Sequence, residues 1–241
     1  MDRRFRGGRS FFSRVASLVM SRSKAKQRWI DYQFRFLPGR PGALLDFGCG
    51  NGSFLRQAES LGWDALGVDF DRAAVAFARQ SGLNAVHVDE FDLTRIAGRF
   101  DAVTLSHVIE HVPHPKRTLA ELHKALKQNG MIYVECPNAE AVGYRVFGQY
   151  WRGLEVPRHF SIPTRAALAD ALEGAGFRDV RFVPFPERFE HLFVESAAIE
   201  QRETGRTRAL AACRTEWKDR IGSLEHGEFL TVTACSYGHC L

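Results

Sequence analysis

Short apolar runs alternate with helical patterns from residue 42 onward, and this alternation constrains the fold of the 241-residue sequence more than any other feature. Strands are predicted at 43–47, 65–69, 84–88, 100–105, 131–136, 177–183 and 228–235, and helices at 53–61, 72–81, 115–128 and 164–175. Strands that alternate with helices form βαβ units around a mostly parallel sheet. Near-continuous apolar strands indicate that helices cover both faces of that sheet. Residues 42–241 are therefore expected to form one α/β domain, with a helical insertion at about 187–222.

Residues 1–41 are expected to form a basic N-terminal arm and a helix outside this domain. Residues 1–40 carry 11 of the 33 Lys and Arg residues and two acidic residues, so the arm has a net charge of +9 in a chain of net charge +5. An apolar stretch at 11–20 can lie on an anionic membrane face or pack on the domain, and both interpretations stay open. A second helix is predicted at 23–37, because Pro38-Gly39 would end it.

Composition and charge exclude several classes of protein. No run of about 18 apolar residues is present, so a transmembrane helix is not expected. The five cysteines are odd in number and widely spread, which favours a reducing cytoplasm over a disulfide framework. The mildly acidic body disfavours RNA or DNA as a partner. We expect a cytoplasmic protein whose arm makes at most weak, peripheral contact with the inner membrane face; the sequence does not indicate an oligomeric state.

A glycine-rich loop follows the first predicted strand and opens the first helix. Gly48, Gly50 and Gly52 form a G-x-G-x-G motif, with Asp46 two residues before it. Glycines there allow a tight turn and a close approach of the backbone to a ligand. Asp69 ends the second strand, where a carboxylate can accept both hydroxyls of a ribose. A dinucleotide would need a third glycine at position 53, which is serine, so the spacing favours S-adenosylmethionine.

Several segments together resemble class I S-adenosylmethionine-dependent methyltransferases, in a branch similar to ubiquinone-type O-methyltransferases. The motifs are LLDFGCGNGSFL (44–55), GVDFD (67–71), VHVDEFD (86–92), FDAVTLSHVIEHVPHP (100–115) and GMIYVECPN (130–138). The resemblance implies a Rossmann-like three-layer sandwich whose seven-stranded, mostly parallel sheet has an antiparallel last strand. It also implies cofactor contacts from Asp46, Gly48, Cys49, Gly50, Gly52, Asp69, Phe70, Asp89, Glu90, Ser106 and His107, with Asp89 next to the adenine.

Two histidines are candidates for a general base in methyl transfer. The cofactor is already reactive, so the protein mainly orients the acceptor and helps to remove its proton. His111 is the first choice and His159 the second, although each is equally compatible with a loop-shaping hydrogen bond. Tyr150, Trp151 and Arg158 are expected at the acceptor pocket. A metal ion on Glu110, His111 and His114 was weighed, but no metal is expected, because a turn gives these side chains no fixed face.

The sequence thus predicts an enzyme that methylates a small-molecule acceptor at a hydroxyl oxygen. A sugar or glycan precursor and a phenolic or quinone-like compound both stay open as the acceptor. The alternative function is a non-catalytic protein that binds S-adenosylmethionine or serves as a scaffold.

Overall fold

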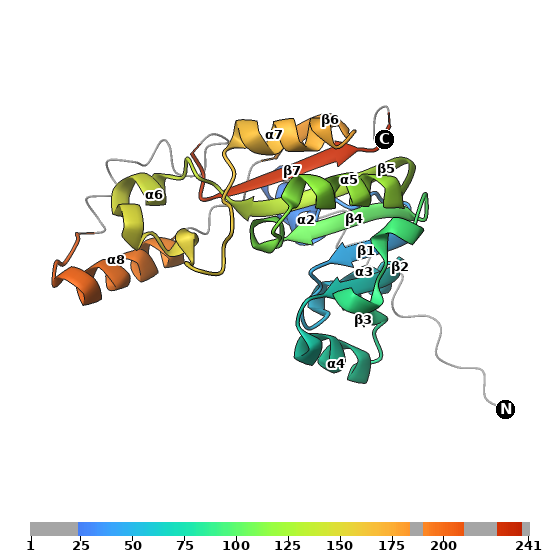
Figure 1. The fold of residues 1–241 in the computed structure, drawn as a ribbon, viewed down its shortest axis with the longest axis horizontal. Coiled ribbons are helices and arrows are strands. Elements are labelled where there is room, and N and C mark those ends of the chain that lie inside the picture. Colours follow the sequence, from blue (N-terminus) through green and yellow to red (C-terminus); the bar gives the residue numbers. More distant parts are fainter. Residues whose placement is uncertain (1–23, 184–189, 210–225, 238–241) are drawn as a thin grey trace.

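The described residues form a seven-stranded sheet flanked by helices (Figure 1). A computed structural model describes residues 24–183, 190–209 and 226–237 of the chain. The strand order is β3-β2-β1-β4-β5-β7-β6. The strands are β1 (Ala43–Phe47), β2 (Asp64–Asp69), β3 (Ala85–His87), β4 (Phe100–Ser106), β5 (Leu126–Pro137), β6 (Arg178–Phe182) and β7 (Phe229–Cys235). β7 runs antiparallel to both β5 and β6, while the pairs among β1 to β5 are parallel. The predicted fold class is confirmed.

Helices cover the two faces of the sheet and give it two separate cores. α3 (Ser53–Ser60) and α4 (Arg72–Gln80) pack on one face, and α5 (Pro115–Ala125) and α7 (Arg165–Gly174) pack on the other. Successive residues of β1 alternate between the cores, because side chains alternate across a strand. Leu44 joins the core under α3, and Leu45 joins the core under α5. The chain therefore forms three layers, as predicted.

The end of α5 differs from the sequence prediction. The helix ends at Ala125, and β5 begins at Leu126, where helix was predicted to continue to 128. Leu126 is extended and buried against the core under α5 and α7. Asn129 then takes a left-handed φ of +61° within the strand. The Asn-Gly pair, interpreted as a helix stop, therefore shapes the start of β5.

A small helical lobe lies beyond the carboxyl ends of the parallel strands, at the left of Figure 1. It consists of α6 (Val142–Phe147), two short 3-10 turns and α8 (Glu190–Thr204). Its apolar side chains form a third cluster of Ala141, Val142, Phe147, Trp151 and Phe193. α8 covers 190–204 of the helical insertion expected at 187–222, of which residues 187–189 and 210–222 lie outside the described residues. No helix in the described ranges has the length and apolarity needed to cross a membrane.

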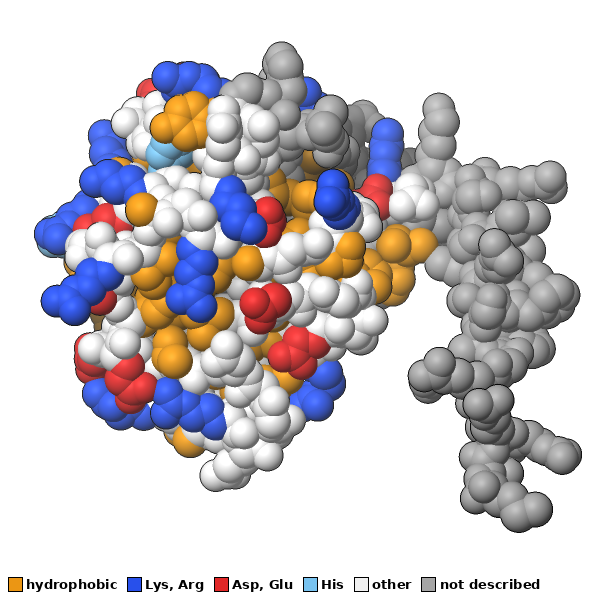
Figure 2. Space-filling view, turned by 90° about the vertical axis from the view of Figure 1, so that its right-hand side faces the viewer, with side chains coloured by type: hydrophobic (Ala, Val, Ile, Leu, Met, Phe, Trp, Pro, Cys, Tyr) orange, Lys and Arg blue, Asp and Glu red, His pale blue; other side chains and the backbone are white. Residues whose placement is uncertain are grey.

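The N-terminal helix α2 (Lys24–Gln33) is shorter than the predicted 23–37 helix. Arg35 and Phe36 take left-handed φ angles of +50° and +54°, which turn the chain before Pro38 is reached. Phe36 and Leu37 then pack into the core under α3 and α4. The apolar stretch at 11–20 lies outside the described residues. On the face in Figure 2, basic and acidic side chains of the described residues are interspersed around a hydrophobic area.

Candidate active site

An open pocket of about 460 Å³ lies at the carboxyl ends of β1, β2 and β4. Its size falls within the usual range for sites that bind small molecules. The strand order reverses between β1 and β4, which is where ligands bind in open α/β sheets. The lining residues are Gly48, Gly50, Asp69, Phe70, Asp71, His107, Val108, His111 and Arg158.

The glycine loop and Asp69 are fastened to each other. The backbone N–H of Gly50 donates to Asp69 Oδ2 over 2.6 Å, and the N–H of Asp71 donates to Asp69 Oδ1 over 2.8 Å. Gly48 has a φ of +88°, and a Cβ there would lie 2.1 Å from Val108 Cγ2. Only glycine fits such a position without displacing its neighbour. The loop and the acid predicted to grip an adenosyl group therefore lie together at the pocket.

Asp46 lies behind the loop and is fully buried. Its Oδ1 accepts hydrogen bonds from Thr104 Oγ1 over 2.8 Å and from Arg35 Nη1. Burial raises the pKa of the Asp46 carboxyl, while Arg35 and Thr104 oppose that rise. Burial also raises the pKa of the Cys49 thiol to about 12, so Cys49 stays a thiol at neutral pH.

The residues expected around the adenine lie on the surface, beside the β2 end. Asp89 Oδ2 pairs with Arg72 Nη2 at 2.7 Å, and Glu90 Oε2 pairs with Arg79 Nη2 at 2.7 Å. Phe70 lines the pocket and is 46% exposed. Asp89 and Glu90 do not line the pocket, because arginines of α4 hold their carboxylates. Their contact with the adenine stays a prediction.

Glu135, at the end of β5, organises the residues predicted at the methionine end of the cofactor. It is buried and lies 3.0 Å from His107 Nε2, and it accepts hydrogen bonds from Tyr133 Oη over 2.6 Å and Ser106 Oγ over 3.4 Å. Burial alone would lower the pKa of His107, but the neighbouring carboxylates of Glu110 and Glu135 outweigh it and raise the pKa to about 9. His107 is therefore an imidazolium at neutral pH. Sequence reasoning missed Glu135, although it lies in the motif segment 130–138.

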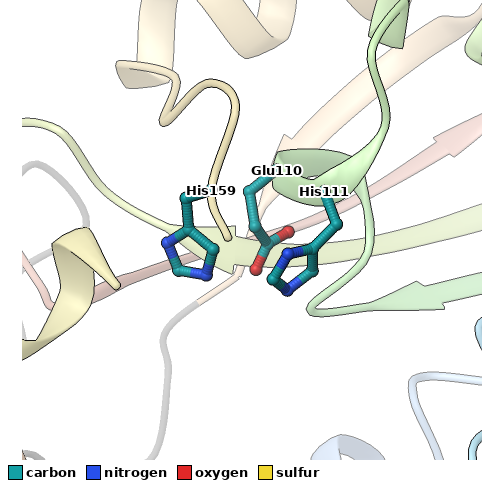
Figure 3. Close-up of side chains that lie close together, drawn as sticks. All are labelled: Glu110, His111 and His159. Atoms are coloured by element: carbon teal, nitrogen blue, oxygen red, sulfur yellow. The ribbon is translucent and has the colours of Figure 1, made fainter. Parts of the chain in front are cut away.

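The two candidate bases, 48 positions apart in the sequence, meet beside a buried carboxylate (Figure 3). The ring centroids of His111 and His159 are 4.7 Å apart. His111 Nδ1 lies 3.0 Å from the carbonyl oxygen of Arg158, and His159 Nδ1 lies 2.9 Å from that of Gly153. Since a carbonyl only accepts, each Nδ1 donates to it, and Nε2 is the ring nitrogen left for other contacts. His159 Nε2 lies 3.3 Å from Glu155 Oε2.

Glu110 lies between the two histidines in this view and is fully buried. Neither of its side-chain oxygens has a hydrogen-bond partner among the described residues, but Oε1 forms an ion pair with His107 Nδ1 at 3.5 Å. One ligand atom from each of Glu110, His111 and His159 lies within 4.8 Å of the others. Two imidazoles and a carboxylate suit a zinc or similar ion as well as proton transfer. His114, a candidate ligand from the sequence, stands at the N-cap position of α5 and does not belong to this group.

The three residues predicted at the acceptor pocket lie in different environments. Arg158 lines the pocket, and its guanidinium pairs with Glu155 at 2.8 Å. Trp151 is 2% exposed and donates from Nε1 to Glu228 Oε2, so it belongs to the core of the lobe and does not line this pocket. Tyr150 is half-buried against the same core. Their contacts with an acceptor stay predictions.

Comparisons with known proteins agree with this geometry. A sequence family described as a methyltransferase domain matches residues 21–181, and this range includes α2. A ubiquinone biosynthesis O-methyltransferase from Bordetella avium is 28% identical over 66% of this chain and 73% of its own length. The corresponding Pseudomonas aeruginosa protein (strain UCBPP-PA14) is 31% identical over 48% of this chain, and the match spans about half of that protein (52%).

Solved structures share the fold at lower identity. An S-adenosylmethionine-dependent methyltransferase from Archaeoglobus fulgidus superposes with a TM-score of 0.62 and 22% identity, covering 93% of this chain and 99% of the other. One from Mesorhizobium loti has a TM-score of 0.56 and 19% identity, covering 86% and 97%. The family match spans more than half of the chain, and it coincides with the glycine loop and the strand-end acid. The chain therefore belongs to the methyltransferase domain family and is an S-adenosylmethionine-dependent methyltransferase.

Proposed function

We propose that the protein methylates a hydroxyl oxygen of a small, phenolic or quinol-like acceptor. The observation that carries the proposal is the pair of imidazoles beside the pocket, with Nδ1 of each ring held by a backbone carbonyl. His111 lines the pocket, so its Nε2 is placed to accept the proton of an acceptor bound there. His159 stands behind it, and burial lowers its pKa, which keeps the ring neutral and able to accept a proton.

The strength of an imidazole base favours a phenol over a sugar. A phenol has a pKa of about 10 against about 6.5 for histidine, so the proton transfer is uphill by about 5 kcal/mol. A sugar hydroxyl is a much weaker acid than a phenol, so the same transfer to an imidazole is further uphill. The similarity to relatives named as ubiquinone biosynthesis O-methyltransferases points to the same acceptor class. A sugar or glycan precursor is the less favoured acceptor.

The cofactor is proposed to lie along the glycine loop. Asp69 would take the ribose hydroxyls, and the backbone of Gly48 and Gly50 would face the cofactor. His107 and Ser106, held by Glu135, would border its methionine end. When bound, S-adenosylmethionine supplies an electrophilic methyl group on a sulfonium; the chain orients the acceptor and removes its proton.

The test measures transfer of labelled methyl to a panel of catechols and phenols, then to fractionated cell extract. His111→Gln should lower turnover about 100-fold or more and leave cofactor affinity unchanged, because only proton removal is affected. His114→Gln is the matched control, since His114 is exposed on the next turn and lies outside the pocket. Unchanged turnover in His111→Gln would remove His111 from the role of base.

Two further outcomes separate this proposal from other roles of the same residues. Turnover lost after dialysis against EDTA and restored by a divalent cation would reassign Glu110, His111 and His159 as metal ligands. Cofactor binding without methylated product from any acceptor pool would favour the non-catalytic alternative.

A further inference from the structure

The last turn of α2 and the turn that follows it reach two acids near the ends of β1 and β5. Arg35 Nη1 donates to Asp46 Oδ1 and, over 3.1 Å, to Thr104 Oγ1. Three residues earlier, a hydrogen bond from Tyr32 helps to hold the pKa of Glu135 below its usual value, although burial acts in the opposite direction. Both acids lie at the carboxyl edge of the sheet, where the pocket opens. One turn of chain outside the predicted domain thus contacts both sides of the site.

The backbone of this turn is strained, and its conformation directs the Arg35 side chain toward Asp46. Arg35 and Phe36 have successive left-handed φ angles, which residues with side chains rarely adopt. The Arg35 guanidinium lies 3.7 Å from the ring centroid of Phe54, at the first turn of α3. Phe36 stacks on Tyr133 with ring centroids 6.3 Å apart. These contacts hold the strained turn against the start of the glycine-loop helix.

Asp46 needs a positive partner because of where it lies. It is fully buried, and its Oδ2 has no hydrogen-bond partner among the described residues. The nearby negative charge of Asp69 also disfavours its ionised form. A buried carboxylate that loses its cationic partner is strongly destabilising, so the carboxyl takes up a proton or its surroundings move. Asp46 is two residues from Gly48, so any movement is passed directly to the loop.

We propose that Arg35 is a positioning residue for the cofactor: its contact with Asp46 makes residues 24–37 a working part of the glycine-loop site. Arg35 acts through Asp46 and does not touch the cofactor. The inference rests on the proposed placement of S-adenosylmethionine along the glycine loop. Residues 24–37 then belong to the cofactor site, where they set the geometry of the glycine loop.

The experiment is a double-mutant cycle read by calorimetric titration with S-adenosylhomocysteine and S-adenosylmethionine. Arg35→Met should weaken binding at least tenfold, because it leaves Asp46 without its cation. Arg35→Met in the Asp46→Asn background should change affinity less than threefold, because no charge is left to neutralise. Arg35→Lys should recover part of the loss, since it restores the charge without the planar fork. Arg28→Met, exposed on α2, is the matched control and should bind like the wild type.

The outcomes distinguish this inference from the proposed function. Wild-type protein that binds neither compound would refute the cofactor placement itself. Wild-type binding with unchanged affinity in Arg35→Met would refute the inference alone, and so would equal losses with and without Asp46→Asn. If Arg35→Met fails to fold, a folded Arg35→Met/Asp46→Asn protein that binds like Asp46→Asn supports the inference, and one that binds much more weakly refutes it.

Discussion

Replacing Gly48 by alanine tests whether the glycine loop is shaped by its close packing against Val108, which follows β4. Gly48 has a φ of +88°, and an alanine Cβ would lie 2.1 Å from Val108 Cγ2 and 3.3 Å from Val108 Cβ. Gly50 also has a positive φ, +53°, but a Cβ there meets nothing within 4 Å. The two glycines therefore share the backbone requirement and differ in the steric one. Gly50→Ala is the matched control for Gly48→Ala.

The structure sets the size of each effect. A left-handed φ costs alanine about 1–2 kcal/mol at either position. Overpacking against Val108 adds about 1–3 kcal/mol at Gly48 alone, because Val108 is 5% exposed and has little room to move. We expect Gly48→Ala to lower the free energy of unfolding by about 2–5 kcal/mol and Gly50→Ala by about 1–2 kcal/mol.

Urea unfolding of the single variants and of Gly48→Ala/Val108→Ala measures these terms. Removing the Val108 methyl groups should recover about 1–3 kcal/mol in the double variant relative to additivity, since the overlap is gone and the strained φ remains. Cofactor titration should show a larger loss of affinity for Gly48→Ala than for Gly50→Ala. Equal destabilisation by the two alanines, or full additivity with Val108→Ala, would refute the packing argument.

Two other expectations follow from single carboxylates. Asp69→Asn should weaken S-adenosylmethionine binding at least tenfold, about 1.4 kcal/mol, because an uncharged amide is a weaker acceptor for Gly50 N–H and the ribose hydroxyls. Calorimetric titration measures the Kd, with the exposed Asp92→Asn as control, and an unchanged Kd would remove Asp69 from the site. Burial raises the pKa of Glu228 to about 7 despite hydrogen bonds from Gly143 N–H and Trp151, so the folded state binds a proton more tightly than the unfolded state, whose pKa is near 4.5. The contribution of Glu228 to the free energy of unfolding is therefore fully present below pH 4.5 and is lost as the pH rises to about 7. Glu228→Gln should reduce the fall in stability between pH 5 and pH 8 by about 2–3 kcal/mol in urea unfolding, and an unaltered fall would contradict the assignment.

The parts of the site that depend on strand ends could be predicted from the sequence. Gly50 and Asp69 follow adjacent parallel strands, and the carboxyl ends of such strands meet at one edge of a sheet. Their 2.6 Å hydrogen bond follows from the order of the strands. Ser106 and His107 end β4 and reach the same edge for the same reason. Local patterns were sufficient here because each residue is within three positions of a strand end.

The parts of the site that depend on contacts between segments far apart in the sequence could not be predicted. His159 meets His111 because the loop after α6 returns to the 3-10 turn that follows β4, where Phe160 N–H donates to the carbonyl of Glu110 over 2.8 Å. No local pattern encodes that contact. Arg35 was missed for another reason: left-handed turns usually carry glycine or asparagine, and this one carries Arg and Phe. Without that signal, the helix was predicted to continue and its arginine was assigned to a solvated arm.

The balance of charge at the pocket edge bears on how fast a methyl group can leave. Asp46, Asp69, Glu110 and Glu135 all lie at the carboxyl edge of the sheet, where the proposed donor with its positive sulfur would bind. Positive charge on sulfur falls as the methyl group moves, so unscreened carboxylates would stabilise the bound donor more than the transition state and slow transfer. The pairing of Asp46 with Arg35 and of Glu135 with His107 reduces that effect while each carboxylate still orients its neighbours. With both pairings in place, an acid-rich edge would bind a sulfonium without slowing transfer. We therefore expect Arg35→Met to slow methyl transfer through the unscreened carboxylate, in addition to the weaker cofactor binding expected from the displaced loop.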